Sequence, residues 1–372
     1  MPISYSTGEK RSFGWVTARE RWPVIITQAI DDLYRSVSDS EEGEKKTEGK
    51  AVTEKIARLK YEVQHDRPLT PIDDDGEPDV KLYNDELASL GEPTWLDTPW
   101  LFCECYLFRR ISTYFKLSTH WKNYDVFARQ KINTFRSSRP AVLELAARFK
   151  ELVQQLEANG SATQDEAAEK LLFAEMCEIC LWGNATDLSL LTSLTYEDIQ
   201  KLQGSEARKA SEKNILANDL PAAYAVLKQA VAEGKKERRV DIVLDNAGFE
   251  LYVDLILAGY LLSAGLATHI VLHPKSIPCE LVVFKGDLNY RKLTGDADWD
   301  PTTPFPDAIK TLGPGSGLNV LALRTCKADV VVGLPAGKDE ELRALEGGGG
   351  DSGARKWAWN GKWAVVSFSQ GK

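Results

Sequence analysis

A short apolar segment followed directly by an amphipathic helix constrains this chain more than any other feature. Residues 240–245 are rich in β-branched side chains, and a highly charged segment precedes them. Such a segment is typical of a strand that is buried on both faces of a sheet. From Phe249 onward, apolar residues recur every three or four positions, which predicts a helix with one apolar face.

Two polar residues, Asp245 and Asn246, stand between this strand and this helix. In open α/β sheets, ligands bind at the carboxyl ends of the strands, and the amino terminus of the following helix favours a phosphate. Carboxylate and carboxamide oxygens suit Mg²⁺ or Mn²⁺, and Gly248 allows a tight turn into the helix. An acid and an amide before a helix are also a common N-cap. Spacing alone leaves both interpretations open, a helix cap and a metal site.

The pattern along the whole chain predicts two domains. Residues 1–205 show helical periods throughout, which indicates an all-helical domain. Beyond residue 206, strand and helix signals alternate, so residues 206–372 are predicted to form a doubly wound α/β/α sheet domain that binds the metal and the phosphate. Asn360 and Gly361 predict a hairpin. The predicted strands are residues 240–245, 269–273, 281–285, 319–324 and 329–333.

Composition argues against several classes of protein. The net charge of −9 is opposite to that of a general nucleic-acid or anionic-membrane binder. The amino terminus shows no secretory signal, and no apolar run approaches the roughly 20 residues that span a bilayer. We therefore expect a globular protein of the cytoplasm, with the nucleus as an alternative location, that binds neither nucleic acid nor membranes.

Cysteines and arginines elsewhere in the chain have structural interpretations. Cys177 and Cys180 form a single CxxC in a helical pattern and are expected to be buried thiols, because zinc ribbons bring a second pair. Arg109 and Arg110 follow a run of aromatic residues. That combination is found on surfaces that stack nucleic-acid bases, but we expect the aromatic residues to form a core. The arginines are then expected to line a cleft or to pair with acids.

Several motifs resemble a known family. Asp245-Asn246-Ala-Gly-Phe-Glu250 is similar to the signature of the DUF89 damage-control phosphatases, which are metal-dependent. Three more segments resemble the sugar-phosphate phosphatase subfamily, whose animal member was also proposed to be a protein-glutamate methyltransferase. They are residues 99–106 with Arg109 and Arg110, residues 284–296, and Arg324-Thr-Cys-Lys327, which fits an Arg-Thr-x-Lys motif. The resemblance runs from near Trp22 to near Phe368.

The resemblance implies a phosphoric monoester hydrolase that acts on small sugar phosphates of the fructose 1-phosphate or fructose 6-phosphate type. It implies that Asp245 and Asn246 are catalytic and hold a divalent metal ion, Mn²⁺ or Mg²⁺, with Co²⁺ or Ni²⁺ as alternatives. The residues implied to contact the phosphorylated sugar are Asp245, Asn246, Asp287, Leu288, Asn289, Tyr290, Arg291 and Lys327.

Physical chemistry agrees with these implied roles. Arg291 can bind two phosphate oxygens at once, and Lys327 supplies a compact positive charge. Asp287 and Asn289 can hydrogen-bond sugar hydroxyls. Each group follows a predicted strand, so the groups are expected to converge on one edge of the sheet. Arg324 is expected to brace the loop rather than to contact the substrate.

One part of the family pattern is missing from this chain. In the family, the residues after Ile-Pro continue into Trp-Phe-Val-Ser-Asp, whose Asp is the third metal ligand, whereas here Pro278 runs directly into Cys279 and Glu280. We therefore expect an internal deletion after Pro278. The predicted strands 269–273 and 281–285 are then only seven residues apart, too few for a crossover helix between neighbouring parallel strands. They must pair antiparallel, lie apart in the sheet, or include a segment that is not a strand.

The missing ligand leaves three functions open. Two protein oxygens would hold a divalent ion weakly; Glu280 is a candidate replacement, whereas Asp254 lies over two helical turns beyond Asp245 and is too far away. The chain is then an active phosphatase, an impaired homologue that still binds phosphate, or an S-adenosylmethionine-dependent protein-glutamate O-methyltransferase. Against the last, Gly313-Pro-Gly-Ser-Gly317 precedes a strand and predicts a turn rather than a nucleotide loop.

Overall fold

The computed structural model describes residues 2–158, 166–183, 213–273 and 281–371. Contacts divide the chain into two compact units, residues 1–131 with 352–354, and residues 132–351 with 355–372. The boundary predicted at residue 205 lies outside the described residues. No helix in the described ranges is both long enough and apolar enough to cross a lipid bilayer.

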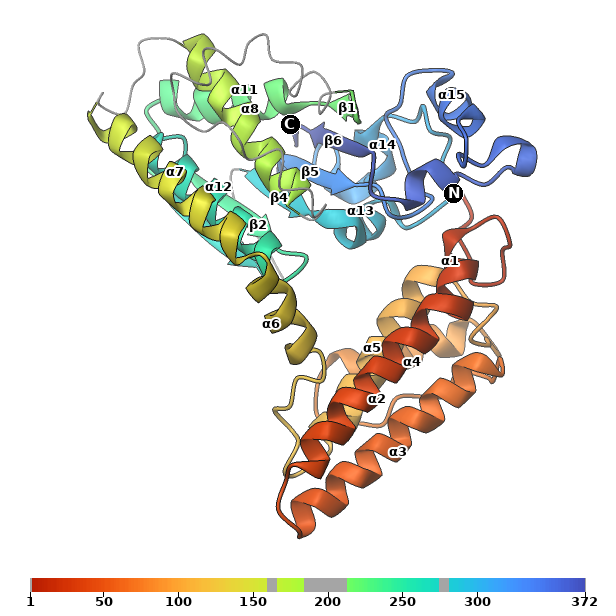
Figure 1. The fold of residues 1–372 in the computed structure, drawn as a ribbon. Coiled ribbons are helices and arrows are strands. Elements are labelled where there is room, and N and C mark those ends of the chain that lie inside the picture. The colour runs from red at the N-terminus through yellow and green to blue at the C-terminus, as the bar shows by residue number, and fades with distance from the viewer. Residues whose placement is uncertain (1, 159–165, 184–212, 274–280, 372) are drawn as a thin grey trace. The chain divides into compact units, whose positions relative to one another are not determined.

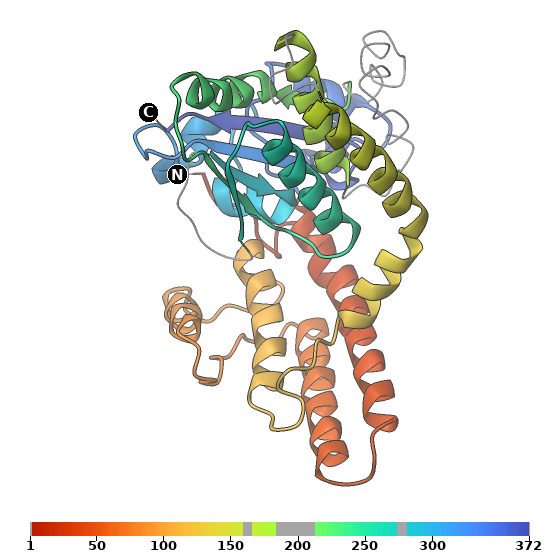
Figure 2. The ribbon, with the colours of Figure 1, turned by 90° about the vertical axis from the view of Figure 1, so that its left-hand side faces the viewer.

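The first unit is helical. Its longest helices, α2 and α3, lie side by side (Figure 2). Of the aromatic side chains predicted to form its core, Trp95, Trp100 and Tyr106 are almost fully buried, whereas Phe108 is exposed. Its helices are α1 (Phe13–Val16), the π-helical turn η1 (Thr17–Arg21), α2 (Trp22–Ser38), α3 (Glu44–Gln64), α4 (Asp79–Ser89) and α5 (Trp100–Lys116).

The two arginines of α5 pair with acids, which is one of the two predicted roles. Arg109 donates hydrogen bonds to Asp75 at 2.7 Å and to Asp79 at 3.0 Å. Arg110 donates to Glu62 at 2.8 Å. Because these guanidinium groups are already bound to carboxylates within their own unit, they are not available as a stacking surface for nucleic-acid bases.

The ion pair between Arg109 and Asp75 makes the first unit sensitive to acid. Hydrogen bonds from Arg109 hold the pKa of Asp75 well below its usual range. Because that pKa is lower in the folded state than in the unfolded state, the stabilisation is present above about pH 4 and is lost as the pH falls toward the folded pKa. We expect Asp75→Asn to lower the free energy of unfolding by about 1–3 kcal/mol at pH 7 and by less at pH 3.

Urea unfolding at both pH values measures this difference. Asp73→Asn makes the same chemical change on an exposed side chain nearby and is expected to change stability by less than about 0.5 kcal/mol. A loss for Asp75→Asn that is equal at pH 7 and pH 3 would contradict the electrostatic origin.

A six-stranded sheet organises the second unit, in the order β1-β6-β5-β4-β2-β3. All neighbouring strands run parallel except β5 and β6, which are antiparallel. The predicted α/β sheet is therefore confirmed. The strands are β1 (Ile215–Asn218), β2 (Arg239–Val243), β3 (His269–His273), β4 (Leu281–Lys285), β5 (Val320–Thr325) and β6 (Ala364–Ser369).

Helices cover both faces of this sheet: α8, α11 and α12 pack together on one face, and α13 lies against the other (Figure 1). Alternate residues of β2, Val240 and Ile242, point into the core on the α12 side. The helices of the chain from residue 128 onward are α6 (Ala128–Ser137), α7 (Arg139–Ala158), α8 (Glu166–Trp182), α11 (Leu220–Ala232), α12 (Phe249–Ser263), α13 (Gly286–Thr294), α14 (Phe305–Ala308) and α15 (Lys338–Ala344), with 3₁₀ turns η4 (Lys310–Leu312), η5 (Gly350–Ser352) and η6 (Lys356–Trp359).

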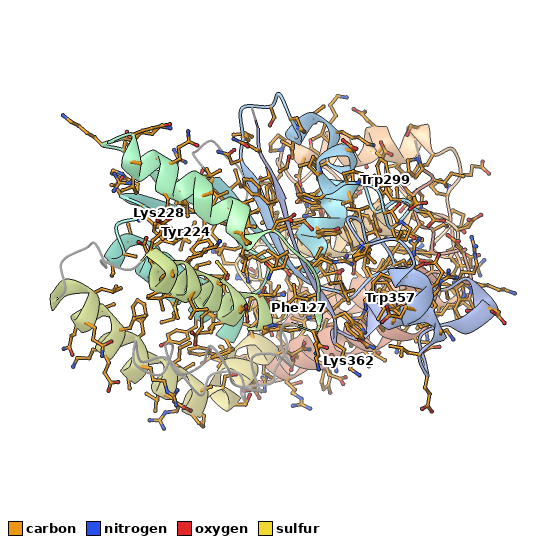
Figure 3. The ribbon with its side chains drawn as sticks, turned by 90° about the horizontal axis from the view of Figure 1, so that it is seen from above. Phe127, Tyr224, Lys228, Trp299, Trp357 and Lys362 are labelled. Atoms are coloured by element: carbon orange, nitrogen blue, oxygen red, sulfur yellow. The ribbon has the colours of Figure 1, made fainter. Side chains whose placement is uncertain are left out.

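Side chains on α11 attach it to α8. Tyr224 and Lys228 lie on the same side of α11 (Figure 3). The ring of Tyr224 packs 5.5 Å from that of Phe173, and Lys228 pairs with Glu169 at 2.8 Å. α8 belongs to the sequence region predicted to be a separate helical domain, but it packs within the second unit.

Two predicted strand features are wrong. Residues 329–333 are buried but irregular, and the hairpin at Asn360 does not form, because η6 stands where its first strand was expected. β6 pairs instead with β1 and β5. The tryptophans of η6 find side-chain partners: the indole of Trp357 (Figure 3) donates to Asp339 at 3.0 Å and that of Trp359 to Asp329 at 2.8 Å.

β3 and β4 are not neighbours in the sheet, although they are only seven residues apart in the sequence. β2 lies between these two strands and pairs parallel with both. Of the three arrangements that the sequence left open, the structure therefore shows strands that lie apart in the sheet. Residues 274–280, including the candidate ligand Glu280, lie outside the described residues.

Candidate active site

The predicted site residues follow strands whose carboxyl ends meet at one edge of the sheet. β2, β4 and β5 are parallel neighbours. Asp245 follows β2, Asp287 follows β4 and Lys327 follows β5. From β2 the chain moves outward to β3, whereas from β4 it moves the opposite way to β5. The chain therefore reverses its direction across the sheet between the neighbouring strands β2 and β4. Their carboxyl ends form a topological switch point, where open α/β sheets bind ligands.

Asp245 is largely buried beside other charged groups. Burial and the negative charges of Glu250 and Asp287 raise its pKa to about 7, whereas the positive charges of Lys285 and Lys327 act in the opposite direction. These influences require all four groups to be close to the Asp245 carboxylate. The site therefore combines three carboxylates with two lysines.

Gly286, the first residue of α13, packs directly against Asp245. Its φ of +81° is in the region that favours glycine, and a Cβ atom at this position would lie 1.8 Å from Oδ2 of Asp245. The carboxylate of Asp245 thus occupies the space that a side chain at position 286 would need. The carboxylate and the amino terminus of α13 are in contact for this reason.

Asn246 links two carboxylates. Its Nδ2 donates to Oδ2 of Asp245 at 3.2 Å and to Oε2 of Glu250 at 2.9 Å. The N-cap of α12 is Gly248, and no side chain makes a capping hydrogen bond there. The alternative interpretation of Asp245 and Asn246 as an ordinary helix cap is therefore wrong.

Asp287 and Arg324 shape the loop that carries Lys327. Oδ1 of Asp287 accepts hydrogen bonds from Nε of Arg324 at 2.8 Å and from the backbone N–H of Lys327 at 2.9 Å. Arg324 is fully buried and also donates to the carbonyls of Ala328, at 3.0 Å, and Val330. The expected bracing role of Arg324 agrees with these contacts.

Three residues of the predicted substrate segment have partners within the fold. Asn289 donates to the carbonyls of Leu244 at 3.2 Å and Lys285 at 2.8 Å, which ties the end of β2 to the end of β4. Arg291 is buried and pairs with Asp296 at 2.9 Å, and the hydroxyl of Tyr290 accepts from the N–H of Val332 at 3.2 Å. Leu288 is partly exposed. The structure brings Asp245, Asn246, Asp287 and Lys327 together and turns Arg291 toward Asp296.

Two residues near Asp245 were not predicted to be functional. Lys285 is almost fully buried, and its ammonium group donates to the carbonyl of Cys180 at 2.6 Å and pairs with Asp254 at 3.2 Å. Glu250 is the last residue of the motif Asp245-Asn246-Ala-Gly-Phe-Glu250, and that motif was the signal available in the sequence. Lys285 lay within the segment 284–296 that resembles the family, but no role was predicted for it. Cys180 is buried, as predicted for the CxxC, and so is Cys177.

The side chains around Asn246 fit a divalent cation. No group of three or more His, Cys, Asp or Glu side chains arranged for a metal ion occurs in the described ranges. The donors here are two carboxylates, Asp245 and Glu250, and one amide, Asn246, all of them hard oxygen ligands that suit Mg²⁺ or Mn²⁺. Oε1 of Glu250 is buried and has no hydrogen-bond partner in the described part of the chain, so it can accept a ligand. Asp254, which was expected to lie too far along the helix to be a ligand, pairs with Lys285.

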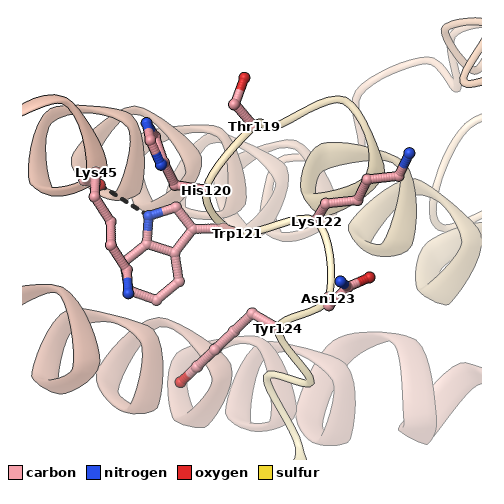
Figure 4. Close-up of a pocket in the computed structure, with 7 residues that line it drawn as sticks. All are labelled: Lys45, Thr119, His120, Trp121, Lys122, Asn123 and Tyr124. Atoms are coloured by element: carbon pink, nitrogen blue, oxygen red, sulfur yellow. Dashed lines mark hydrogen bonds between the residues drawn. The ribbon is translucent and has the colours of Figure 1, made fainter.

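A hollow in the first unit is a weaker candidate for the active site (Figure 4). The indole of Trp121 donates across it to the backbone carbonyl of Lys45 at 2.8 Å. None of its lining residues belongs to the motifs that the sequence analysis singled out. They are Lys45, Thr119, His120, Trp121, Lys122, Asn123 and Tyr124.

Comparison with known proteins shows the family of this chain. The model of the damage-control phosphatase ARMT1-like domain matches residues 17–280 and 279–342. The chain belongs to this family. Proteins called damage-control phosphatase ARMT1 are similar over their whole length: the Xenopus laevis protein is 33% identical over 99% of each chain, the Danio rerio protein 31% over 99% of this chain and 97% of its own, and the Homo sapiens protein 29% over 99% and 98%.

The same comparisons support the predicted deletion. The family model matches in two pieces that meet at residues 279 and 280, directly after Pro278. The alignment with the Xenopus laevis protein spans 453 positions, more than the 372 residues of this chain, so that relative has residues that this chain lacks.

Proposed function

We propose that this chain is a metal-dependent phosphatase that hydrolyses small sugar phosphates of the fructose 1-phosphate or fructose 6-phosphate type. Membership in the damage-control phosphatase family supports phosphoric monoester hydrolysis. The observation that supports the proposal is the contact of Asp245 and Asn246 with each other and of Asp245 with the start of α13 at the switch point of the sheet, where Asp287 also holds the backbone of Lys327. There α12 and α13 both begin, and helix amino termini favour a bound phosphate.

Each residue of this group has a role in the proposal. Asp245 and Asn246 would hold a divalent metal ion, Mn²⁺ or Mg²⁺ with Co²⁺ or Ni²⁺ as alternatives, and the bound ion supplies polarisation of the phosphoryl group. Lys327 would neutralise the nonbridging phosphate oxygens. Backbone N–H groups at the start of α13 would donate to the same oxygens. The charge that develops in the transition state would thus meet fixed positive groups.

The segment from Asp287 to Arg291 would act in two ways. Asp287 would hold the Lys327 loop in place through its hydrogen bond to the backbone of that residue. The buried residues Asn289, Tyr290 and Arg291 would position α13, because their observed partners are protein groups. From this segment, contact with the sugar would then come from Leu288, which is partly exposed, whereas its neighbours are buried.

Phosphate release from fructose 1-phosphate tests the proposal. We expect release to require Mn²⁺ or Mg²⁺ and Asp245→Asn to lower kcat/KM by about 100-fold or more, since a bound metal supplies several kcal/mol of transition-state stabilisation. Lys327→Met is expected mainly to raise KM. The control Asp307→Asn changes an exposed side chain of α14 and is expected to leave the rate unchanged.

Other outcomes separate the remaining functions. Tight binding of the phosphate ester without turnover would indicate the impaired homologue. Transfer of a labelled methyl group from S-adenosylmethionine to a protein carboxylate, at a stoichiometric rate, would indicate the methyltransferase. Metal-independent release that survives Asp245→Asn would refute the proposed site.

A further inference from the structure

Glu250 is buried in the first turn of α12, and its carboxylate faces the amide that Asp245 also contacts. The residue is 4% exposed. Its Oε2 accepts from Nδ2 of Asn246 at 2.9 Å, and the same nitrogen lies 3.2 Å from Oδ2 of Asp245. One amide group therefore stands between two carboxylates that come from opposite sides of the turn into α12.

The other carboxylate oxygen of Glu250 is the observation that indicates a bound ligand. Oε1 is buried and makes no hydrogen bond to any described residue. A buried carboxylate oxygen that lacks a partner is costly, and a second carboxylate nearby adds to the cost. Lys285 interacts electrostatically with Glu250, but its hydrogen-bonding contacts are with Asp254 and the carbonyl of Cys180. A cation between Asp245 and Glu250 would remove both costs.

The side-chain amide of Asn246 can also offer an oxygen to a bound cation. In the structure the partly positive Nδ2 of Asn246 lies between the two carboxylates. The oxygen and nitrogen of a carboxamide exchange places by half a turn about one bond. That turn would direct Oδ1 of Asn246 to the space between Asp245 and Glu250. Three oxygens would then surround one position.

We propose that Glu250 supplies the third protein oxygen of the metal site in this chain and takes the place of the family's third aspartate, which the deletion after Pro278 removes. The ligand is a divalent cation that prefers oxygen donors, Mn²⁺ or Mg²⁺. This inference rests on the proposed function, since it concerns the same site.

A rival role for Glu250 is to orient Asn246 by accepting its hydrogen bond. Glu250→Gln distinguishes the two roles, because a glutamine carbonyl still accepts a hydrogen bond but carries no negative charge. If Glu250 only orients Asn246, the substitution leaves metal affinity nearly unchanged. If Glu250 is a ligand, the affinity falls although the hydrogen bond can remain.

Titration of the full-length chain with Mn²⁺, by calorimetry and by electron paramagnetic resonance, measures metal binding without any substrate. We expect Glu250→Gln to raise the Kd for Mn²⁺ by at least about tenfold, the lower end of the loss seen when even an outer partner of a metal ligand is removed. Glu237→Gln is the matched control: it makes the same change on an exposed side chain before β2, at the opposite edge of the sheet, and is expected to change the Kd by less than about twofold. Circular dichroism checks that each variant is folded.

The outcomes separate this inference from the proposed function. An unchanged Kd in Glu250→Gln, together with lost binding in Asp245→Asn, would overturn the role of Glu250 and leave the phosphatase proposal standing. Weakened binding in Glu250→Gln, without phosphatase activity in the unaltered chain, would support the ligand role and refute the phosphatase proposal. Failure of the unaltered chain to bind Mn²⁺ would overturn both.

Discussion

Replacing Gly286 by alanine is expected to abolish metal-dependent phosphate release and to destabilise the protein. The added Cβ would lie 1.8 Å from Oδ2 and 2.8 Å from Cβ of Asp245, so the carboxylate has to leave its position. The φ of +81° adds backbone strain of about 1–3 kcal/mol, because residues other than glycine are unfavourable at this angle. We expect the loss in kcat/KM to match that of Asp245→Asn, about 100-fold or more, since both changes would disrupt the proposed metal ligand Asp245.

Gly295→Ala provides the control for backbone strain. Gly295 ends the same helix at a φ of +70°, and no atom lies within 4 Å of the Cβ that an alanine would add. This variant is expected to lose stability by a similar amount and to keep its activity. Thermal unfolding and phosphate release, measured on both variants, separate the two effects. Equal activity in the two variants would show that contact between Gly286 and Asp245 is not needed.

Lys285→Met is expected to lower the free energy of unfolding by about 3–5 kcal/mol, the usual cost of removing one partner from a buried ion pair. Lys285 and Asp254 are both almost completely buried and lie 3.2 Å apart. Without Lys285, the buried carboxyl group of Asp254 loses its cationic partner, and the carbonyl of Cys180 loses its donor. Chemical denaturation measures the loss.

A double variant tests the cause of this loss. Lys285→Met combined with Asp254→Leu removes both charges, and apolar replacements of a buried ion pair are often neutral. We therefore expect the double variant to be more stable than Lys285→Met alone. A double variant that is less stable would show that packing around β4, rather than the stranded charge of Asp254, causes the loss.

Local patterns in the sequence were sufficient for part of the site. Asp245 and Asn246 were predicted at the end of a strand because apolar β-branched residues precede them and a helical period follows. Lys327 was predicted on the same edge because it also follows a strand. Glu250 lay within the recognised motif, but a spacing of four residues does not say whether its carboxylate turns toward Asn246 or toward solvent.

Other features depended on contacts between distant parts of the chain. Residues 329–333 have the composition of a strand, yet they do not join the sheet, and the carbonyl of Val330 accepts a hydrogen bond from Arg324. Arg291 has the chemistry of a phosphate ligand, yet it pairs with Asp296, which follows the end of the same helix. The chemistry of a side chain determines which groups it is able to bind. Its neighbours in the fold determine which group it does bind.

The sequence by itself determined the order of strands and helices around Asp245, the family motifs and the deletion after Pro278, because periodicity, turn chemistry and motif spacing are properties of neighbouring residues. The tertiary structure alone decided that β2 separates β3 from β4, that Lys285 is buried against Asp254, and that Asn246 lies between two carboxylates. These arrangements depend on which strands pair and on which side chains lose contact with water, and residues far apart in the chain settle both.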